Sequence, residues 1–336
     1  MSPAVNNHTA GTAISPQDAV STNTPLVDVR DLTVRFGPVR AVSNVSYQLW
    51  PGEFLGIVGE SGSGKSVAAR ALINLLAPSA SVTGRVLFNG ADVLQFSPAH
   101  LRDLRGSQIG FIFQDALSAL DPVYSIGAQL VEVCRAKSRS LSRKSARARA
   151  LSLLAEVGIS DPERCFASYP HQLSGGMKQR AVIAAALISD PVLIIADEPT
   201  TALDVTVQRQ VLDLLRDIAA ARGVAVILIT HDLGVVAETC DRVAVFYGGQ
   251  IVEEADTVAL FDTPRHPYTA ALLQSLPKLG GDDGFVAIPG APPLILAALS
   301  ACPFAPRCVR VLPACTAALP NETTGDDRRF RCVNPL

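Results

Sequence analysis

The sequence of 336 residues lacks any apolar run long enough to cross a membrane. A membrane-spanning helix needs roughly 20 consecutive apolar residues, whereas the longest apolar stretches here, such as Val224–Thr230, have the length of strands. The chain also lacks an excess of positive charge, because its formal net charge is −2. A protein that binds nucleic acid or an anionic membrane surface usually has such an excess. We therefore expect no nucleic-acid partner.

The first 24 residues lack the basic start and the apolar centre of a secretory signal. They are rich in Ser, Thr, Asn, Ala and Pro, a composition that is typical of a disordered tail. We expect residues 1–24 to be disordered and the protein to be cytoplasmic, where thiols stay reduced. Disulfides are then a poor explanation for the seven cysteines.

Short apolar strands alternate with amphipathic helices along much of the chain. Apolar segments at 53–59, 192–197 and 224–230 are separated by helical patterns, of which residues 205–223 are an example. This alternation predicts an α/β fold with a parallel sheet that helices cover on both faces. Stretches rich in β-branched residues near 26–36 and 42–50 predict further strands, and residues 125–190 have mostly helical patterns.

The string "GESGSGKS" follows a predicted strand and opens a predicted helix. This context fits a phosphate-binding loop, whose glycines let backbone N–H groups close around phosphates at a helix N-terminus. Lys65 is expected to reach the β- and γ-phosphates, and the Ser66 hydroxyl to bind Mg²⁺. The predicted nucleotide-binding residues are Gly59, Glu60, Ser61, Gly62, Ser63, Gly64, Lys65 and Ser66.

Polar side chains follow three other predicted strands. Asp197 ends the strand 192–197 and is expected to hold Mg²⁺, while Glu198 beside it is expected to take a proton from an attacking water. His231 and Gln114 end the strands 224–230 and 109–114, and Gln114 is a further candidate for contacting Mg²⁺ or the water. The carboxyl ends of parallel strands meet at one edge of a sheet. We therefore predict a phosphate-hydrolysing site with Glu198, His231 and Gln114 as its catalytic residues.

The string "LSGGMKQR" offers a second anion-binding surface at a helix start, although the chain already has a phosphate loop. It resembles the signature motif of ABC ATPases, in which two nucleotide-binding domains stack head to tail and each signature completes the other's ATP site. The resemblance implies that Ser174, Gly175 and Gly176 bind the ATP of a partner domain. Further positions match the family's motifs in order: the Q-loop at Gln114, Walker B at Asp197, the D-loop "TALD" at Asp204 and the switch histidine at His231.

Phe36 lies where the family places an aromatic residue that stacks on adenine, although a core Phe in a strand would look the same. The resemblance implies a RecA-like parallel sheet, an antiparallel β subdomain and an α-helical subdomain at about residues 115–190, all within residues 25–276. Residues 277–336 then form an extension of the kind found in peptide importers.

The chain further resembles the ATPase subunits of bacterial peptide and nickel importers, in "DEPTTALDVTVQ" and in "HPYTAALLQSLP". This resemblance implies an enzyme that hydrolyses ATP with Mg²⁺ and energises the uptake of di- or oligopeptides. The implied partners are a second ATPase subunit, expected to be a different chain, two membrane permease subunits and an extracytoplasmic solute-binding protein. The implied location is peripheral, on the cytoplasmic face of the cell membrane.

Two alternatives to this function stay open. The transported solute could instead be nickel, glutathione or an opine, because the stretch 116–122, "ALSALDP", differs from the subfamily's usual one where membrane subunits dock. A soluble ABC ATPase of DNA repair, translation or iron–sulfur assembly is an alternative of a different class. Repair types have long coiled-coil insertions and translation types have two ATPase domains, and neither feature occurs in this sequence.

Four cysteines follow one another near the end of the chain with the spacing C-x5-C-x6-C-x16-C. This part has too few periodic apolar residues to fold on a core of its own, and a metal centre would stabilise it. The C-x2–4-C pairs of zinc ribbons are missing from it, and the wider spacing suits a [4Fe–4S] cluster, which some members of the subfamily carry. Zinc is the alternative. The predicted ligands are Cys302, Cys308, Cys315 and Cys332, whereas Cys134, Cys165 and Cys240 are expected to pack as small apolar residues.

Overall fold

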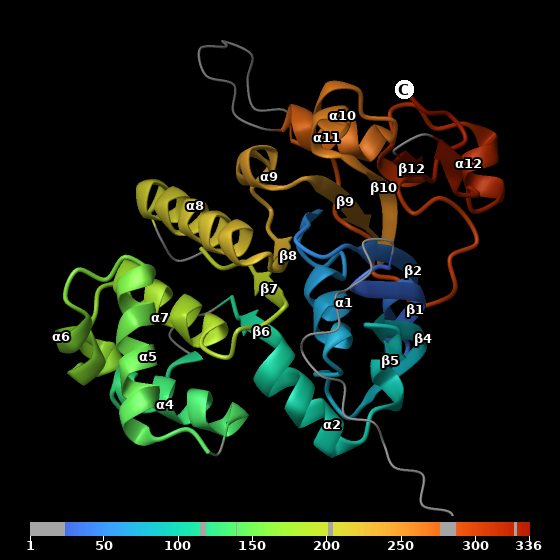
Figure 1. The fold of residues 1–336 in the computed structure, drawn as a ribbon. Coiled ribbons are helices and arrows are strands. Elements are labelled where there is room, and N and C mark those ends of the chain that lie inside the picture. Colours follow the sequence, from blue (N-terminus) through green and yellow to red (C-terminus); the bar gives the residue numbers. More distant parts are fainter. Residues whose placement is uncertain (1–23, 115–118, 139, 201–203, 276–286, 326–327) are drawn as a thin grey trace, which may run out of the picture.

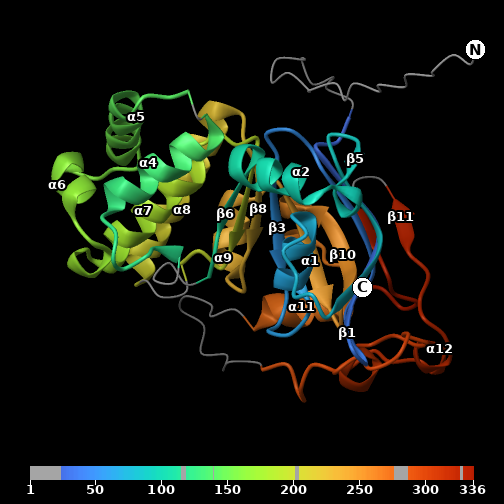
Figure 2. The same cartoon turned by 90° about the horizontal axis from the view of Figure 1, so that it is seen from below.

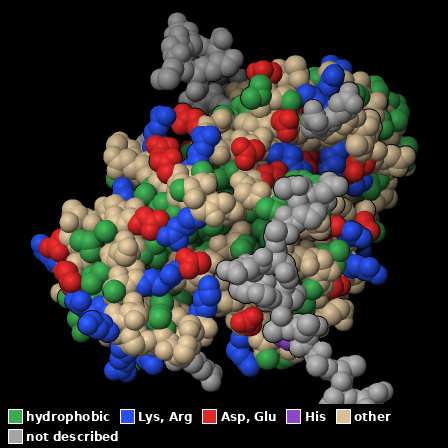
Figure 3. Space-filling model, in the orientation of Figure 1, with side chains coloured by type: hydrophobic (Ala, Val, Ile, Leu, Met, Phe, Trp, Pro, Cys, Tyr) green, Lys and Arg blue, Asp and Glu red, His purple; other side chains and the backbone are tan. Residues whose placement is uncertain are grey.

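The computed structural model describes residues 24–114, 119–138, 140–200, 204–275, 287–325 and 328–336. The predicted disordered tail lies almost wholly outside these ranges, as do residues 201–203 of the D-loop and the predicted boundary at residue 277. Within these ranges, no helix combines the length and the apolar character that a membrane span requires. Lys and Arg side chains are interspersed with Asp and Glu over the face in Figure 3.

The centre of the molecule is a sheet in the order β11-β12-β10-β9-β3-β8-β7-β6. Its strands from β9 to β6 run parallel, and every residue of β3, β7 and β8 is buried. These three strands are the apolar runs of the sequence, so the predicted parallel sheet is confirmed. The parallel strands are β3 (Phe54–Val58), β6 (Ile109–Ile112), β7 (Leu193–Asp197), β8 (Ala225–Ile229) and β9 (Arg242–Tyr247). The next strand, β10 (Gln250–Asp256), is antiparallel to β9.

Both faces of this sheet are covered. Leu193 and Ile195 of β7 enter a core that includes α1 (Lys65–Leu72) and the antiparallel sheet. The alternate residues, Ile194 and Ala196, enter a second core on the other face. This core receives residues of α7 (Gly175–Leu187), α8 (Val205–Arg222) and α9 (Leu233–Thr239).

The antiparallel β subdomain is a sheet in the order β2-β1-β4-β5. Its two long strands come from the segments rich in β-branched residues, and alternate side chains of β2 are buried over much of its length. The subdomain that the family resemblance implies is therefore confirmed. Its strands are β1 (Val27–Phe36), β2 (Val39–Leu49), β4 (Ala80–Phe88) and β5 (Ala91–Asp92).

The helical subdomain lies at one end of the molecule, where α4 to α7 gather beside β6 (Figures 1 and 2). Its helices begin at polar caps: the Ser125 and Ser142 hydroxyls accept hydrogen bonds from the first turns of two of them. The predicted helical character of residues 125–190 is thus confirmed. The remaining helices are α2 (Pro98–Asp103), α4 (Ile126–Lys137), α5 (Arg143–Glu156), α6 (Pro162–Ala167), α10 (Thr257–Asp262) and α11 (Pro267–Gln274).

The C-terminal extension lies at the opposite end and adds a hairpin to the central sheet. Its strand β12 (Arg328–Phe330) pairs with β10 and with β11 (Thr323–Gly325). A short helix, α12 (Pro313–Ala317), precedes the hairpin. The side chain of Phe304 enters the core that the sheet shares with α7 to α9. The described part of the extension is therefore packed directly onto the central sheet and its core.

Candidate functional site

The loop between β3 and α1 can be built only with glycine at two positions. Gly59 has φ +144° and Gly64 has φ +101°, which are conformations that L side chains rarely adopt. A Cβ at Gly59 would lie 2.2 Å from the carbonyl oxygen of Phe246, and one at Gly64 would lie 2.3 Å from that of Ala41. The loop thus passes very close to neighbouring backbone, as a phosphate cradle at a helix N-terminus does.

Lys65 places its ammonium inside this loop. Its Nζ donates to the carbonyl oxygens of Gly59, at 2.7 Å, and Glu60, at 2.9 Å. Burial lowers the pKa of Lys65, while the nearby carboxylates of Glu198, Asp197 and Glu60 oppose this effect. A buried cation at the start of α1 is the partner that a nucleotide's phosphates require.

Ser66 and Asp197 meet beside the loop. The Ser66 hydroxyl donates to Oδ1 of Asp197 at 2.7 Å, and the carboxylate is fully buried at the end of β7. Its Oδ2 has no hydrogen-bond partner among the described residues, and Nη2 of Arg70 lies 3.8 Å from it. Burial raises the pKa of Asp197, although Ser66 and Arg70 oppose this. A hydroxyl beside a buried carboxylate oxygen that lacks a hydrogen bond fits the oxygen ligands that Mg²⁺ prefers.

The carboxylate of Glu198 is contacted by two side chains that come from the ends of neighbouring strands. Nε2 of Gln114 donates to its Oε2 at 2.9 Å, and Nδ1 of His231 lies 3.4 Å from its Oε1. Glu198 has φ +48°, a left-handed conformation that costs about 1 kcal/mol or more in a residue other than glycine. Its own N–H is held by the carbonyl of Ile229 at 2.8 Å. The structure therefore brings together the sheet-edge residues that the sequence predicts.

The remaining predicted residues of the ATP site lie at two other helix starts and at the end of β1. Ser174 caps α7, where its hydroxyl accepts from Met177, and Ser174 and Gly175 are exposed. Asp204 caps α8 and is exposed, whereas Phe36 is half-buried at the end of β1. The N-terminus of α7 belongs to the helical subdomain, while the phosphate loop opens α1 on the central sheet (Figure 1).

Two residues beside the site were missed by reasoning from the sequence. Arg70 follows Ser66 by one helical turn, so the spacing on α1 could have revealed that both approach Asp197. Arg307 forms an ion pair with the phosphate-loop residue Glu60. It follows Glu60 by 247 positions, and no local sequence pattern predicts such a contact.

The four C-terminal cysteines line one small pocket, together with His266, Phe304 and Arg310. Backbone N–H groups lie 3.4 Å from the sulfurs of Cys315 and Cys332, and burial raises the thiol pKa of Cys302, Cys308 and Cys332. Across the described residues, no group of three or more His, Cys, Asp or Glu is arranged to hold a metal ion. The other three cysteines, Cys134, Cys165 and Cys240, are buried as expected.

An apolar pocket of about 280 Å³ lies between β6 and the helical subdomain. Its lining includes Phe111, Leu120, Val182 and the partly exposed side chains of Leu75 and Val133. Leu120 belongs to the stretch 116–122, of which residues 116–118 lie outside the described part.

Three protein-family models match parts of the chain, and one of them, described as "AAA domain, putative AbiEii toxin, Type IV TA system", matches residues 166–237. The model described as "ABC transporter" matches residues 42–201, which include the phosphate loop, Ser174 and Asp197. The model described as "Oligopeptide/dipeptide transporter, C-terminal region" matches residues 252–315. This last match includes α11 and the first three of the four C-terminal cysteines.

Known proteins resemble the chain over most of its length. It is 42% identical to "Dipeptide transport ATP-binding protein DppD" of Escherichia coli over 318 residues, which are 93% of this chain and 97% of that protein. It is 47% identical to "Oligopeptide transport ATP-binding protein OppD" of Mycobacterium tuberculosis over 92% of this chain, but it spans only 52% of that protein.

A solved structure of a dimeric ATP-binding cassette in a post-hydrolysis state, bound to ADP and Pi, has a similar fold. Its TM-score is 0.62 at 30% identity, over 69% of this chain and 98% of that one.

Proposed function

The chain belongs to the family of ATP-binding proteins of oligopeptide and dipeptide ABC transporters, and from this we propose that it hydrolyses ATP to energise peptide uptake. The observation that most supports the proposal is the convergence of two residue pairs at one sheet edge. Ser66 and Asp197 form the first pair, and Gln114 and Glu198 the second. The match to the oligopeptide and dipeptide transport proteins favours transport over a soluble ABC ATPase.

In the proposed reaction, the loop from Gly59 to Gly64 holds the phosphates of ATP, and Lys65 neutralises the β- and γ-phosphates. Ser66 and Asp197 would hold Mg²⁺, with Gln114 as a further ligand, and the ion would stabilise charge that develops on the phosphates. Glu198 accepts the proton of the attacking water. His231 keeps the carboxylate of Glu198 oriented toward that water.

The signature motif is proposed to act on a second ATPase subunit. Ser174 and Gly175 are exposed at the N-terminus of α7, where backbone N–H groups can bind an anion from outside the chain. Gly176 and the nearby Asp204 would lie in the same subunit contact, and Phe36 would stack on adenine. The proposed second ATPase subunit is a different chain.

The membrane partners are proposed to dock in the apolar pocket beside β6. Phe111 of β6 and Leu120 both line this pocket, and both lie close in sequence to Gln114. A permease segment bound in the pocket would therefore contact the part of the chain that carries Gln114 into the ATP site. We propose two permease subunits and an extracytoplasmic binding protein, with the chain peripheral on the cytoplasmic face of the membrane. Peptides are the proposed solute, and nickel, glutathione or opines are alternatives.

The four cysteines are proposed to hold a [4Fe–4S] cluster, with zinc as the alternative. Support comes from their shared pocket and from the N–H groups that approach two of the sulfurs, because such contacts stabilise thiolate ligands of clusters. The cluster would supply a structural crosslink. Cys302, Cys308, Cys315 and Cys332 would thereby fix a segment whose helix and strands are all short.

ATP turnover by the full-length chain with its membrane partners tests the proposed activity. The wild type should release phosphate from ATP in the presence of Mg²⁺, and Lys65→Ala should lose nucleotide binding. Lys144→Ala, which changes an exposed lysine on α5, is the matched control and should behave as the wild type. Absence of Mg²⁺-dependent phosphate release by the wild-type complex would refute the proposal.

A further inference from the structure

Arg307 of the C-terminal extension holds the second residue of the phosphate loop. Its Nη1 donates to Oε2 of Glu60 at 2.7 Å and its Nη2 donates to Oε1 at 2.9 Å. Two parallel hydrogen bonds between a guanidinium and a carboxylate fix both the distance and the orientation of the pair. The contact therefore constrains Glu60 more firmly than a single charge contact would.

Arg307 is itself held in place from several sides. It is only 9% exposed, and its Nε donates to the carbonyl oxygen of Pro289 at 2.7 Å. Its Nη1 also contacts the hydroxyl of Tyr247 at 3.1 Å, and the guanidinium lies over the ring of Tyr247 at 5.7 Å from its centre. A guanidinium with this many partners has little freedom left, so it can act as a rigid support for the loop.

Glu60 passes this support to the residues that face the nucleotide. Its backbone N–H donates to the hydroxyl of Tyr268 at 2.9 Å, and its carbonyl accepts from Nζ of Lys65 at 2.9 Å. The carboxylate, the N–H and the carbonyl of one loop residue are thus all engaged. Arg307 and Tyr268 hold Glu60 from outside the loop, and Lys65 holds it from inside.

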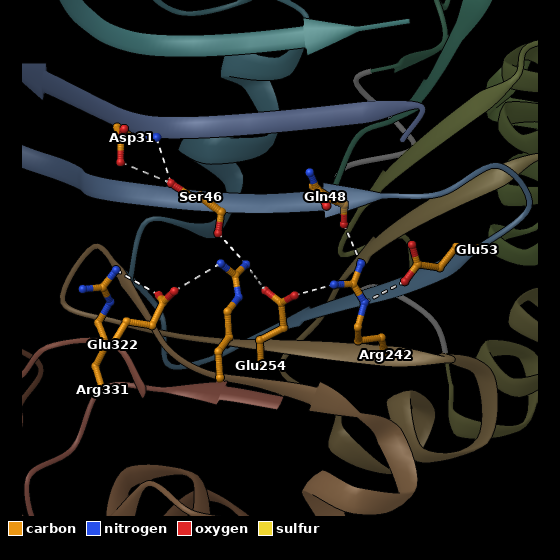
Figure 4. Close-up of polar contacts among 9 residues, drawn as sticks. Asp31, Ser46, Gln48, Glu53, Arg242, Glu254, Glu322 and Arg331 are labelled. Atoms are coloured by element: carbon orange, nitrogen blue, oxygen red, sulfur yellow. Dashed lines mark hydrogen bonds and ion pairs between the residues drawn. The ribbon is translucent and has the colours of Figure 1, made fainter. Parts of the chain in front are cut away.

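The extension has a second attachment that is separate from the loop. Glu254 of β10 forms ion pairs with Arg242 of β9 and with Arg329 of β12. Arg329 also donates to the backbone carbonyl oxygen of Ser46. Figure 4 shows Glu254 in a row of side chains of alternating charge that includes Arg242 and Glu322, with Ser46 on the neighbouring strand β2. Loss of Arg307 would therefore leave the hairpin of the extension attached, and the effect on the loop can be separated from the effect on the fold.

We propose that Arg307 is a positioning residue for ATP binding: through Glu60 it sets the backbone geometry of the phosphate loop. This inference rests on the proposed function, because it requires ATP in that loop. Arg307 is engaged by Glu60, Tyr247 and backbone carbonyls and is not placed on the phosphates. Arg307 should therefore stabilise bound ATP and the transition state equally. Its loss should then raise KM and leave kcat unchanged.

Nucleotide binding and turnover by the full-length chain with its membrane partners test this role. Arg307→Ala should raise the Kd for mant-ATP and the KM for ATP about tenfold, the factor expected from one charged hydrogen-bonded pair, while kcat changes less than about twofold. Arg307→Lys should give an intermediate KM, because an ammonium cannot form the two-pronged contact. The double variant Glu60→Ala/Arg307→Ala should be no worse than Glu60→Ala alone.

Arg329→Ala is the matched control, because it weakens the other attachment of the extension and should leave the KM for ATP unchanged. Equal KM values for Arg307→Ala and wild type would overturn the inference, and so would an equal rise in Arg329→Ala. If Arg307→Ala does not fold, Glu60→Gln replaces it, with a KM raised about threefold because the contact loses its charge. Failure of the wild type to bind mant-ATP would instead overturn the proposed function.

Discussion

The hydroxyl of Ser66, at the start of α1, donates a hydrogen bond of 2.7 Å to Asp197 at the end of β7, 131 positions later in the chain. This contact joins the phosphate loop to the strand that supplies the acidic residues. It leaves the second oxygen of a fully buried carboxylate without a hydrogen bond among the described residues. Burial of this carboxylate outweighs its contacts with Ser66 and Arg70, so Asp197 is expected to destabilise the metal-free protein and to stabilise the protein that has bound Mg²⁺.

Asp197→Asn should raise the free energy of unfolding by about 1–2 kcal/mol when Mg²⁺ and nucleotide are removed, because it deletes a buried charge. Burial raises the pKa of Asp197 in the folded protein, so the ionised carboxylate disfavours folding at pH values above that raised pKa. As the pH falls through it toward the unfolded value of about 3.9, folding takes up a proton and the advantage of Asn should disappear. Urea unfolding at several pH values measures this difference, and an Asn variant that is less stable at neutral pH would contradict it.

Gly175→Asp should leave ATP binding by the isolated subunit intact and stop hydrolysis in the assembled complex. The reason is that Gly175 is exposed in the helical subdomain, and a carboxylate there would repel the phosphates bound by a partner subunit. Equilibrium binding of mant-ATP and phosphate release by the complex provide the two measurements. A variant subunit that no longer binds ATP by itself would indicate a local role for the signature.

Val133→Glu should reduce peptide uptake at least tenfold while the isolated subunit still binds ATP. Val133 lines the apolar pocket proposed to receive a permease segment and is 37% exposed, so a charge there would have to be desolvated on docking. Val258→Glu is the matched control, since Val258 is 73% exposed on α10. Co-purification with the permeases checks the cause, and equal assembly and uptake by the two variants would rule out docking at this pocket.

Cys308→Ser should remove the iron of protein purified without oxygen, which should otherwise contain about four irons per chain and be brown. Cys134→Ser, which changes a buried cysteine of the helical subdomain, is the control and should keep the iron. Elemental analysis and the visible absorption spectrum measure both. One zinc per chain would replace the cluster by the alternative metal, whereas metal-free wild-type protein would refute a metal centre of either kind.

The sequence predicted the core of the site because its geometry follows from the order of strands. Gln114, Asp197 and His231 each follow an apolar run, and the ends of neighbouring parallel strands lie at one edge. In the structure, Glu198 receives contacts from both Gln114 and His231. Such residues can be found from periodicity and position alone.

The contacts of the C-terminal extension could not be predicted in this way. The strands β11 and β12 have three residues each, and their burial patterns do not alternate, so they leave no period-2 signal. The pairing of Arg307 with Glu60 depends on how the extension packs on Tyr247 and Tyr268. Tertiary packing of this kind is not encoded in any short stretch of the chain.

Uptake of a labelled dipeptide by cells that lack this gene, and that are supplied with the wild type or with Glu198→Gln, tests the central claim most directly. The wild type should restore uptake. Glu198→Gln should bind ATP and keep the two ATPase subunits associated, yet reduce phosphate release and uptake by about 100-fold or more, because no base remains to accept the proton of the water. Uptake with Glu198→Gln at a rate close to that of the wild type would contradict the account.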